Sequence, residues 1–211
     1  MEKVFKIIVA VFSAVLLSTG AFAQTAEEIL AKVDAQTNRP ADEGSYFVME
    51  MKIPLLGTFS SDVYTRGEKI RMEVNDAGKR SISFIDGETH WDYDPAKNEI
   101  VIKTVPKDKP SNAQENMQMI KGFGNGYTPS IRKETDDAWY IRCTKDRDNP
   151  DKDVPKRMDL VVLKPDCRLQ SVSASASIVT ITMRDFDFGV PESKVTFDAA
   201  EFPGATIVDN R

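Results

Sequence analysis

The sequence predicts a mainly β protein with few helices: a strongly curved antiparallel sheet of about eleven strands, an unclosed β-barrel, with helices as a lid over its concave face. Three observations lead to this fold class. A turn at Asp86-Gly87 is flanked by alternating segments, the same two-residue alternation continues through most of the chain, and only two segments carry helix-start signals.

The hairpin around Asp86-Gly87 is the strongest of these signals. Glycine adopts positive φ without steric cost, so Asp-Gly between alternating segments is typical of a tight β-turn. Apolar and polar residues alternate over 82–85 before the turn and over 89–93 after it, and Asp94-Pro95 ends the second strand.

Further strands follow from the same alternation and from the turn residues between them. In the segment 69–74 we expect Ile70, Met72 and Val74 to face the core, with Lys69, Arg71 and Glu73 facing out. The other strands are expected over residues 45–53, 59–63, 100–104, 130–134, 138–144, 158–163, 169–176 and 178–188.

Two segments carry capping boxes, in which a Ser or Thr side chain and a Glu or Gln three residues later satisfy the first backbone amides of a helix. Thr25–Glu28 begins an amphipathic helix that ends before Arg39-Pro40. Ser111–Gln114 begins a second, shorter helix with an apolar stripe that includes Met117 and Ile120.

The N-terminus predicts export. Lys3 and Lys6 precede an apolar run over 7–17 that is too short to span a bilayer, and Ala21-Phe22-Ala23 fits a cleavage site. We therefore expect a signal peptide over 1–23, cleaved after Ala23, and a single soluble domain over 24–211.

Charge argues against nucleic-acid binding and against electrostatic docking on an anionic bilayer. Cleavage would remove two of the 28 basic and one of the 33 acidic residues, leaving 26 and 32 and a net charge of −6. Basic residues are not clustered.

Two short helices cannot cover eleven strands, so we expect an apolar interior larger than ordinary packing requires. Methionine is flexible and adapts to varied apolar shapes, which suits a surface that repacks around a ligand, although it also fills gaps in a dry core. Both readings stay open for the inward-facing set Met49, Met51, Met72, Met117, Met119 and Met183.

The sequence offers little catalytic chemistry. His90 is the single histidine, no metal-binding spacing or nucleophile motif occurs, and no cofactor or metal is expected. We expect His90 to be an ordinary strand residue, Asp92 and Asp94 to be solvated, and the protein not to be an enzyme. Cys143 and Cys167 could form a disulfide only through an irregular loop, because the expected strands hold them apart.

The motif Asp86-Gly87-x-Thr89-x-Trp91-x-Tyr93-x-Pro95 resembles the one found in LolA-type periplasmic lipoprotein carriers. The tail over 195–209 is similar to the closing segment of that family, 28–33 fits its first helix, and 63–71 resembles the segment before the motif.

The resemblance implies a monomeric periplasmic carrier that receives lipoprotein acyl chains from an inner-membrane releasing complex and hands them to an outer-membrane acceptor. A lipid-binding or lipoprotein-sensing domain of the same fold is the alternative. Arg66 best matches the arginine that latches the lid, although Gly67-Glu68 replaces the Arg-Pro that follows it in the family. The acyl cavity would be lined by Phe47, Met49, Met51, Phe59, Val63, Ile70, Met72, Phe84, Trp91, Tyr93, Ile102, Met117 and Ile120.

Overall fold

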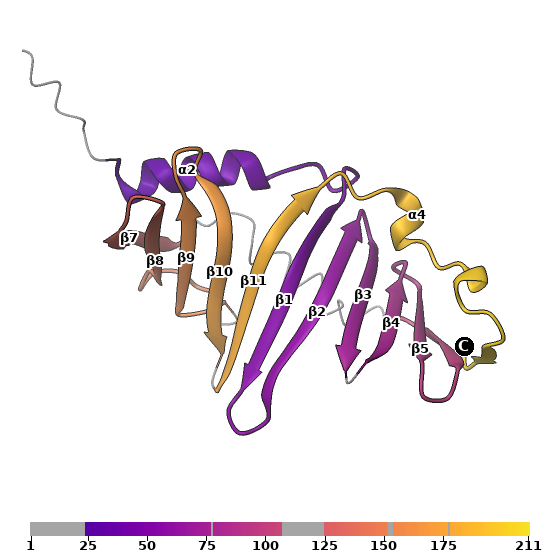
Figure 1. Ribbon diagram of the computed structural model, residues 1–211. Coiled ribbons are helices and arrows are strands. Elements are labelled where there is room, and N and C mark those ends of the chain that lie inside the picture. The colour runs from indigo at the N-terminus through magenta and orange to yellow at the C-terminus, as the bar shows by residue number, and fades with distance from the viewer. Residues whose placement is uncertain (1–23, 77, 107–124, 152–153, 177) are drawn as a thin grey trace, which may run out of the picture.

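The computed structural model describes residues 24–76, 78–106, 125–151, 154–176 and 178–211, and in them the protein is a single twelve-stranded sheet. The strand order is β12-β6-β5-β4-β3-β2-β1-β11-β10-β9-β8-β7. The sheet is twisted and curved and stays open, with β12 and β7 as its two edges (Figure 1). The predicted mainly β, unclosed architecture is therefore confirmed.

The strands form a meander whose two halves meet where β1 pairs with β11. The second expected helix, with Met117 and Ile120, lies outside the described residues. The described elements are α2 (Ala26–Thr37), β1 (Ser45–Ile53), β2 (Gly57–Arg66), β3 (Lys69–Asp76), β4 (Lys79–Ile85), β5 (Thr89–Asp94), β6 (Glu99–Thr104), β7 (Tyr127–Glu134), β8 (Ala138–Lys145), β9 (Arg157–Leu163), β10 (Arg168–Ala176), β11 (Val179–Phe188), α4 (Glu192–Val195), the 3-10 turn η1 (Ala199–Glu201) and β12 (Thr206–Asp209).

The predicted hairpin at Asp86-Gly87 joins β4 to β5. Gly87 has φ +94°, in the region that favours glycine. The Asp86 carboxylate accepts hydrogen bonds from the backbone N–H groups of Glu88 (3.1 Å) and Thr89 (2.7 Å), which fixes the turn.

The tail departs from the antiparallel expectation. After β11 the chain forms α4 and η1 and then runs as β12 beside β6, parallel to it. Because the tail crosses the sheet before it reaches the edge, it joins the edge strand in the same direction as β6. We call residues 190–205 the tail segment.

The two faces of the sheet can be assigned from the strand registers, because residues directly opposite each other in neighbouring strands point to the same side. On one face Phe47 lies opposite Val63, and Val63 lies opposite Met72. We call this the α2 face, because the four buried residues of α2 belong to its core cluster: Ala26, Ile29, Leu30 and Val33.

The opposite face, which we call the α4 face, carries a second core on β4, β5 and β6. Phe202 of the tail segment packs there with Phe84, and Phe197 packs against the same cluster. Phe84 lies opposite Trp91, and Trp91 lies opposite Ile102, so all three share this face. Between β3 and β4 the buried apolar side chains therefore move from the α2 face to the α4 face.

The charged residues of β3 lie at this change of side. Arg71 and Glu73 are only 3% and 5% exposed, which corrects the expectation that they face solvent. They are buried because Lys194 and Glu201 of the tail segment bond to them from above the α4 face.

Both cysteines are free and fully buried. Cys143 lies on β8 within the α2-face core, and Cys167 lies in the turn between β9 and β10. Burial raises the pKa of the Cys143 thiol to about 11, so it behaves as a small apolar core residue.

Candidate ligand-binding face

The α2 face is apolar from β3 across the centre of the sheet to β8. Alternation supplies the side chains: Met49 lies opposite Met183, Met183 opposite Val172, and Val172 opposite Leu160. All four are buried. Helix α2 covers one part of this face, where it contacts β7 and β10 (Figure 1).

Burial decreases along the strands toward the turn between β1 and β2. Phe47 is 1% exposed, whereas Met51, nearer the turn on the same face of β1, is only partly buried. Met72 on β3 lies opposite the fully buried Val63 and is also only partly buried. Phe59, which lies opposite Met51, is 50% exposed. The face therefore has a closed part under α2 and an open part that extends toward this turn and onto β3.

Near the turn, the open part is lined by apolar side chains from three neighbouring strands, β11, β1 and β2. Ile181 on β11 lies opposite Met51 and is also partly buried. The alternation over 178–188 predicts the strand, but Ile181 is missing from the predicted site. Only the pairing of β1 with β11, two strands that are distant in sequence, places Ile181 beside Met51.

The same face becomes polar on β4, β5 and β6. Asp92 accepts hydrogen bonds from Ser83 Oγ (2.7 Å) and Lys103 Nζ (3.2 Å), and its Oδ1 lies 2.8 Å from His90 Nε2. Burial opposes ionisation of this carboxyl, but these donors and the nearby imidazole outweigh it and hold the pKa of Asp92 well below its usual range. His90 and Asp92 are thus half-buried partners of each other.

The registers divide the predicted cavity residues into two groups. Seven lie on the α2 face: Phe47, Met49, Met51, Phe59, Val63, Ile70 and Met72. Four lie on the opposite face, under the tail segment: Phe84, Trp91, Tyr93 and Ile102. The prediction that one cavity collects both groups is corrected here, because the sheet separates them.

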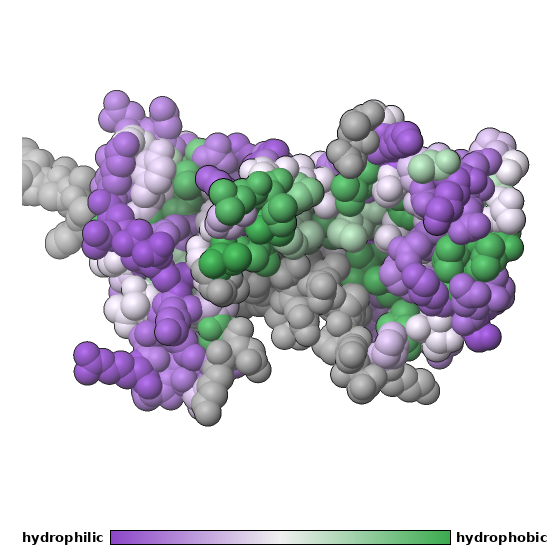
Figure 2. All heavy atoms as spheres, turned by 90° about the horizontal axis from the view of Figure 1, so that it is seen from below, coloured by the Kyte–Doolittle hydropathy of each residue, from purple (hydrophilic) through white to green (hydrophobic). Residues whose placement is uncertain are grey.

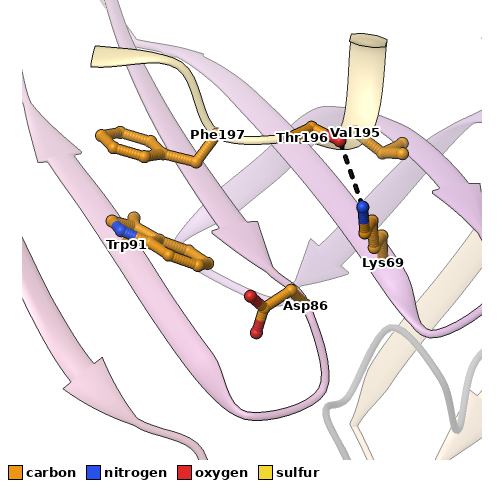
Figure 3. A pocket seen from close by; sticks show the side chains of 6 residues that line it. All are labelled: Lys69, Asp86, Trp91, Val195, Thr196 and Phe197. Atoms are coloured by element: carbon orange, nitrogen blue, oxygen red, sulfur yellow. Dashed lines mark hydrogen bonds between the residues drawn. The ribbon is translucent and has the colours of Figure 1, made fainter. Parts of the chain in front are cut away.

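A small cavity of about 250 Å³ lies on the α4 face, between the tail segment and the β4–β5 hairpin (Figure 3). The Trp91 ring stacks on the Phe197 ring with centroids 5.2 Å apart. Lys69 points to Thr196, with Nζ 3.3 Å from Oγ1, and also pairs with Glu192. The cavity is lined by Lys69, Asp86, Trp91, Val195, Thr196 and Phe197.

This cavity is below the usual range for small-molecule sites, about 300–1,000 Å³. Its charged groups are also engaged: Lys69 bonds the tail segment, and Asp86 accepts two backbone hydrogen bonds of its own turn. The open part of the α2 face is therefore the better candidate for a ligand.

Arg66, the predicted lid latch, lies at the end of β2. Its Nη1 donates to the backbone oxygens of Val190 (2.7 Å) and Glu43 (3.1 Å), and its Nε lies 3.3 Å from Glu192. In the described residues Arg66 therefore ties β2 to the loop before β1 and to the start of the tail segment.

Two further observations concern the described residues alone. None of their helices is long and apolar enough to cross a membrane. Among the same residues, no three His, Cys, Asp or Glu side chains come together as a metal site would require.

Comparisons with known proteins give similarity in structure but not in sequence. No family model matches the chain, and no curated protein matches it. The chain is similar to the lipoprotein LppX of Mycobacterium tuberculosis, with 12% identity over 78% of this chain and 97% of that chain, and a TM-score of 0.47.

Two other solved structures are similar over more of this chain. An uncharacterized conserved protein of Thermus thermophilus is 15% identical over 89% of this chain and 100% of that chain, with a TM-score of 0.45. A LolA superfamily protein of Nitrosomonas europaea is 16% identical over 83% of this chain and 99% of that chain, with a TM-score of 0.35.

Proposed function

We propose that this protein is a soluble periplasmic chaperone that binds the acyl chains of lipoproteins on the open part of the α2 face and delivers them to the outer membrane. The observation that carries the proposal is the partly exposed set Met51, Met72 and Ile181, which continues the buried core of the same face.

The physical reason is the cost of exposing hydrocarbon to water, about 0.8 kcal/mol for each CH₂ group. A lipoprotein with several long chains cannot leave a membrane unaided, so a carrier has to supply an apolar surface. Methionine side chains such as Met51 and Met72 adjust to a flexible chain without a fixed shape of their own.

The proposal also includes a periplasmic location and the transfer of cargo between two partners. The N-terminal segment over 1–23 has the features of a cleavable signal peptide, which supports a periplasmic location. A carrier of this kind would take its cargo from an inner-membrane releasing complex and give it to a tighter outer-membrane acceptor. Its role would be binding rather than catalysis, and it would act as a monomer.

The experiment compares Met51→Glu and Met72→Glu with Thr58→Glu. Thr58 is exposed and lies on the α4 face, next in sequence to Phe59. We expect the two methionine variants to lose at least about tenfold in affinity for a lipidated lipoprotein, because a buried carboxylate opposes acyl binding. Thr58→Glu should bind like wild type.

Native mass spectrometry of the protein purified from an envelope extract identifies the cargo. A co-purifying lipoprotein supports the carrier, and a free phospholipid would instead make this a lipid-binding or sensing protein. Equal lipoprotein affinity in all three variants would exclude the α2 face as the binding surface.

A further inference from the structure

The turn between β1 and β2 exposes large apolar side chains. Leu55 is 106% exposed and Leu56 is 70% exposed, and Phe59 follows at 50%. The neighbouring turn between β10 and β11 adds Ile178, which is 67% exposed. We call these four residues the tip patch.

Strand pairing brings the two turns together. Lys52 lies opposite Thr180 where β1 pairs with β11. Leu55 and Ile178 therefore belong to adjacent turns at the same end of these central strands. Among the turns at this end of the strands, the one between β1 and β2 projects farthest (Figure 1). Apolar atoms gather there when the molecule is viewed from that end (Figure 2).

The backbone of the first turn gives an independent reason to assign a role to this patch. Leu55 has φ +67°, a left-handed conformation that an exposed turn normally gives to glycine or asparagine. A leucine that is both fully exposed and strained contributes little to folding. Strained residues of this kind concentrate at functional sites.

The patch also continues the proposed binding surface. Phe59 lies opposite Met51, and Met51 lies opposite Ile181, so apolar side chains run without a break from the turn onto the open part of the α2 face. Lys52 is the single charged residue within 51–60 and 178–182.

Taking the proposed function as its basis, we propose that the tip patch inserts into the interface of a neutral lipid bilayer and guides acyl chains between the membrane and the α2 face. The protein is acidic overall and has one lysine near these two turns, so electrostatic attraction to an anionic membrane is not expected. A second copy of the chain is a poorer occupant, because a stable dimer needs about 800 Å² from each partner and two hairpin turns present less.

The test measures flotation of the exported form with phosphatidylcholine vesicles, after mass spectrometry has verified removal of the N-terminal segment. Leu55→Gly combined with Leu56→Ser should lower vesicle binding at least about tenfold, because two exposed leucines no longer enter the bilayer. Ile207→Ser is the matched control: Ile207 is 52% exposed but lies on β12, at the edge strand far from the patch.

Folding failure can be separated from loss of binding. Glycine accepts the φ of Leu55, so Leu55→Gly alone should leave the unfolding midpoint equal or higher while it still weakens vesicle binding. Binding should also persist when salt is raised from about 0.1 M to about 1 M, because it is apolar.

The outcomes for the tip patch and for the α2 face are distinguishable. A fluorescent fatty acid added in solution should bind the Leu55→Gly, Leu56→Ser variant like wild type, whereas Met51→Glu should lose that probe and keep vesicle binding. Equal vesicle binding by the tip variant and wild type would overturn the proposal. So would binding abolished by salt, or a solution dimer that the tip substitutions dissociate.

Discussion

Arg71 on β3 and Glu201 in the tail segment form a double hydrogen bond, with Nη1 3.0 Å from Oε1 and Nη2 2.8 Å from Oε2. Arg71 Nε also donates to Glu73 over 2.7 Å, and the guanidinium lies 4.7 Å from the centre of the Phe84 ring. Lys194 Nζ donates to Glu73 over 3.0 Å. This network fastens the tail segment at the point where the apolar side of the sheet changes.

Arg71→Met should lower the free energy of unfolding by about 3 kcal/mol, because it removes the positive charge that pairs with both the buried Glu73 and Glu201. Urea denaturation measures the change, and limited proteolysis should show earlier cleavage in the tail segment.

Arg142→Met is the control for that change. Arg142 pairs with Asp159 at 2.7 Å, but the two side chains are 32% and 42% exposed. Solvent screens such a pair, so the loss should stay below about 1 kcal/mol. If both variants lost the same amount, the buried network would not be what holds the tail segment.

Acid should destabilise the protein through Glu73. Burial raises the pKa of this carboxyl, but hydrogen bonds from Arg80 and Lys194 and the charge of Arg71 outweigh it and lower the pKa. A carboxyl with a lowered pKa in the folded state contributes stability above its unfolded pKa of about 4.3 and loses it as the pH falls. Unfolding free energy should therefore decrease from about pH 5 downward.

Glu73→Gln tests the assignment of that slope. The variant should be less stable than wild type at neutral pH, yet its stability should fall less steeply between about pH 5 and pH 3. Urea titrations at several pH values measure both quantities. An unchanged slope would mean that other carboxyls cause the acid sensitivity.

Alanine substitution of two phenylalanines on opposite faces should have very different effects on the free energy of unfolding. Phe84 is 1% exposed and meets the Phe197 and Phe202 rings edge-on, so Phe84→Ala should cost about 4 kcal/mol of stability. Phe59→Ala removes a half-exposed ring of the α2 face and should cost less than about 1 kcal/mol.

The ligand separates these two variants further. Phe59→Ala should weaken binding of a fluorescent fatty acid, whereas Phe84→Ala, measured where it is folded, should bind like wild type. If the loss fell on Phe84→Ala instead, the ligand would lie on the α4 face beneath the tail segment.

Alternation predicts strands well because it depends on each strand alone. It predicted the β4–β5 hairpin at Asp86-Gly87, in which Phe84 and Trp91 lie opposite each other on one face. It could not tell which face of the whole sheet those residues share, because that depends on the register between β3 and β4. Ile70 lies opposite Ile85, so Phe84 points away from Ile70.

Contacts between distant parts of the sequence were the other part that alternation missed. Arg71 and Glu73 have the pattern of a solvent-facing strand edge, and their burial depends on residues more than a hundred positions later. The aromatic residues Phe197 and Phe202 were a usable signal, since a tail rich in large rings needs an apolar surface to cover.

The first and last described elements each cover the half of the sheet that is farther from them in sequence. Helix α2, near the start, packs on β7 and β10, and Phe202, near the end, covers β4 and β6. Neither half can therefore bury its core until the described part of the other half is present, α2 for β7 to β10 and the tail segment for β4 to β6. Such long-range closure of contacts slows folding, because distant segments have to meet before the core contacts between them can form.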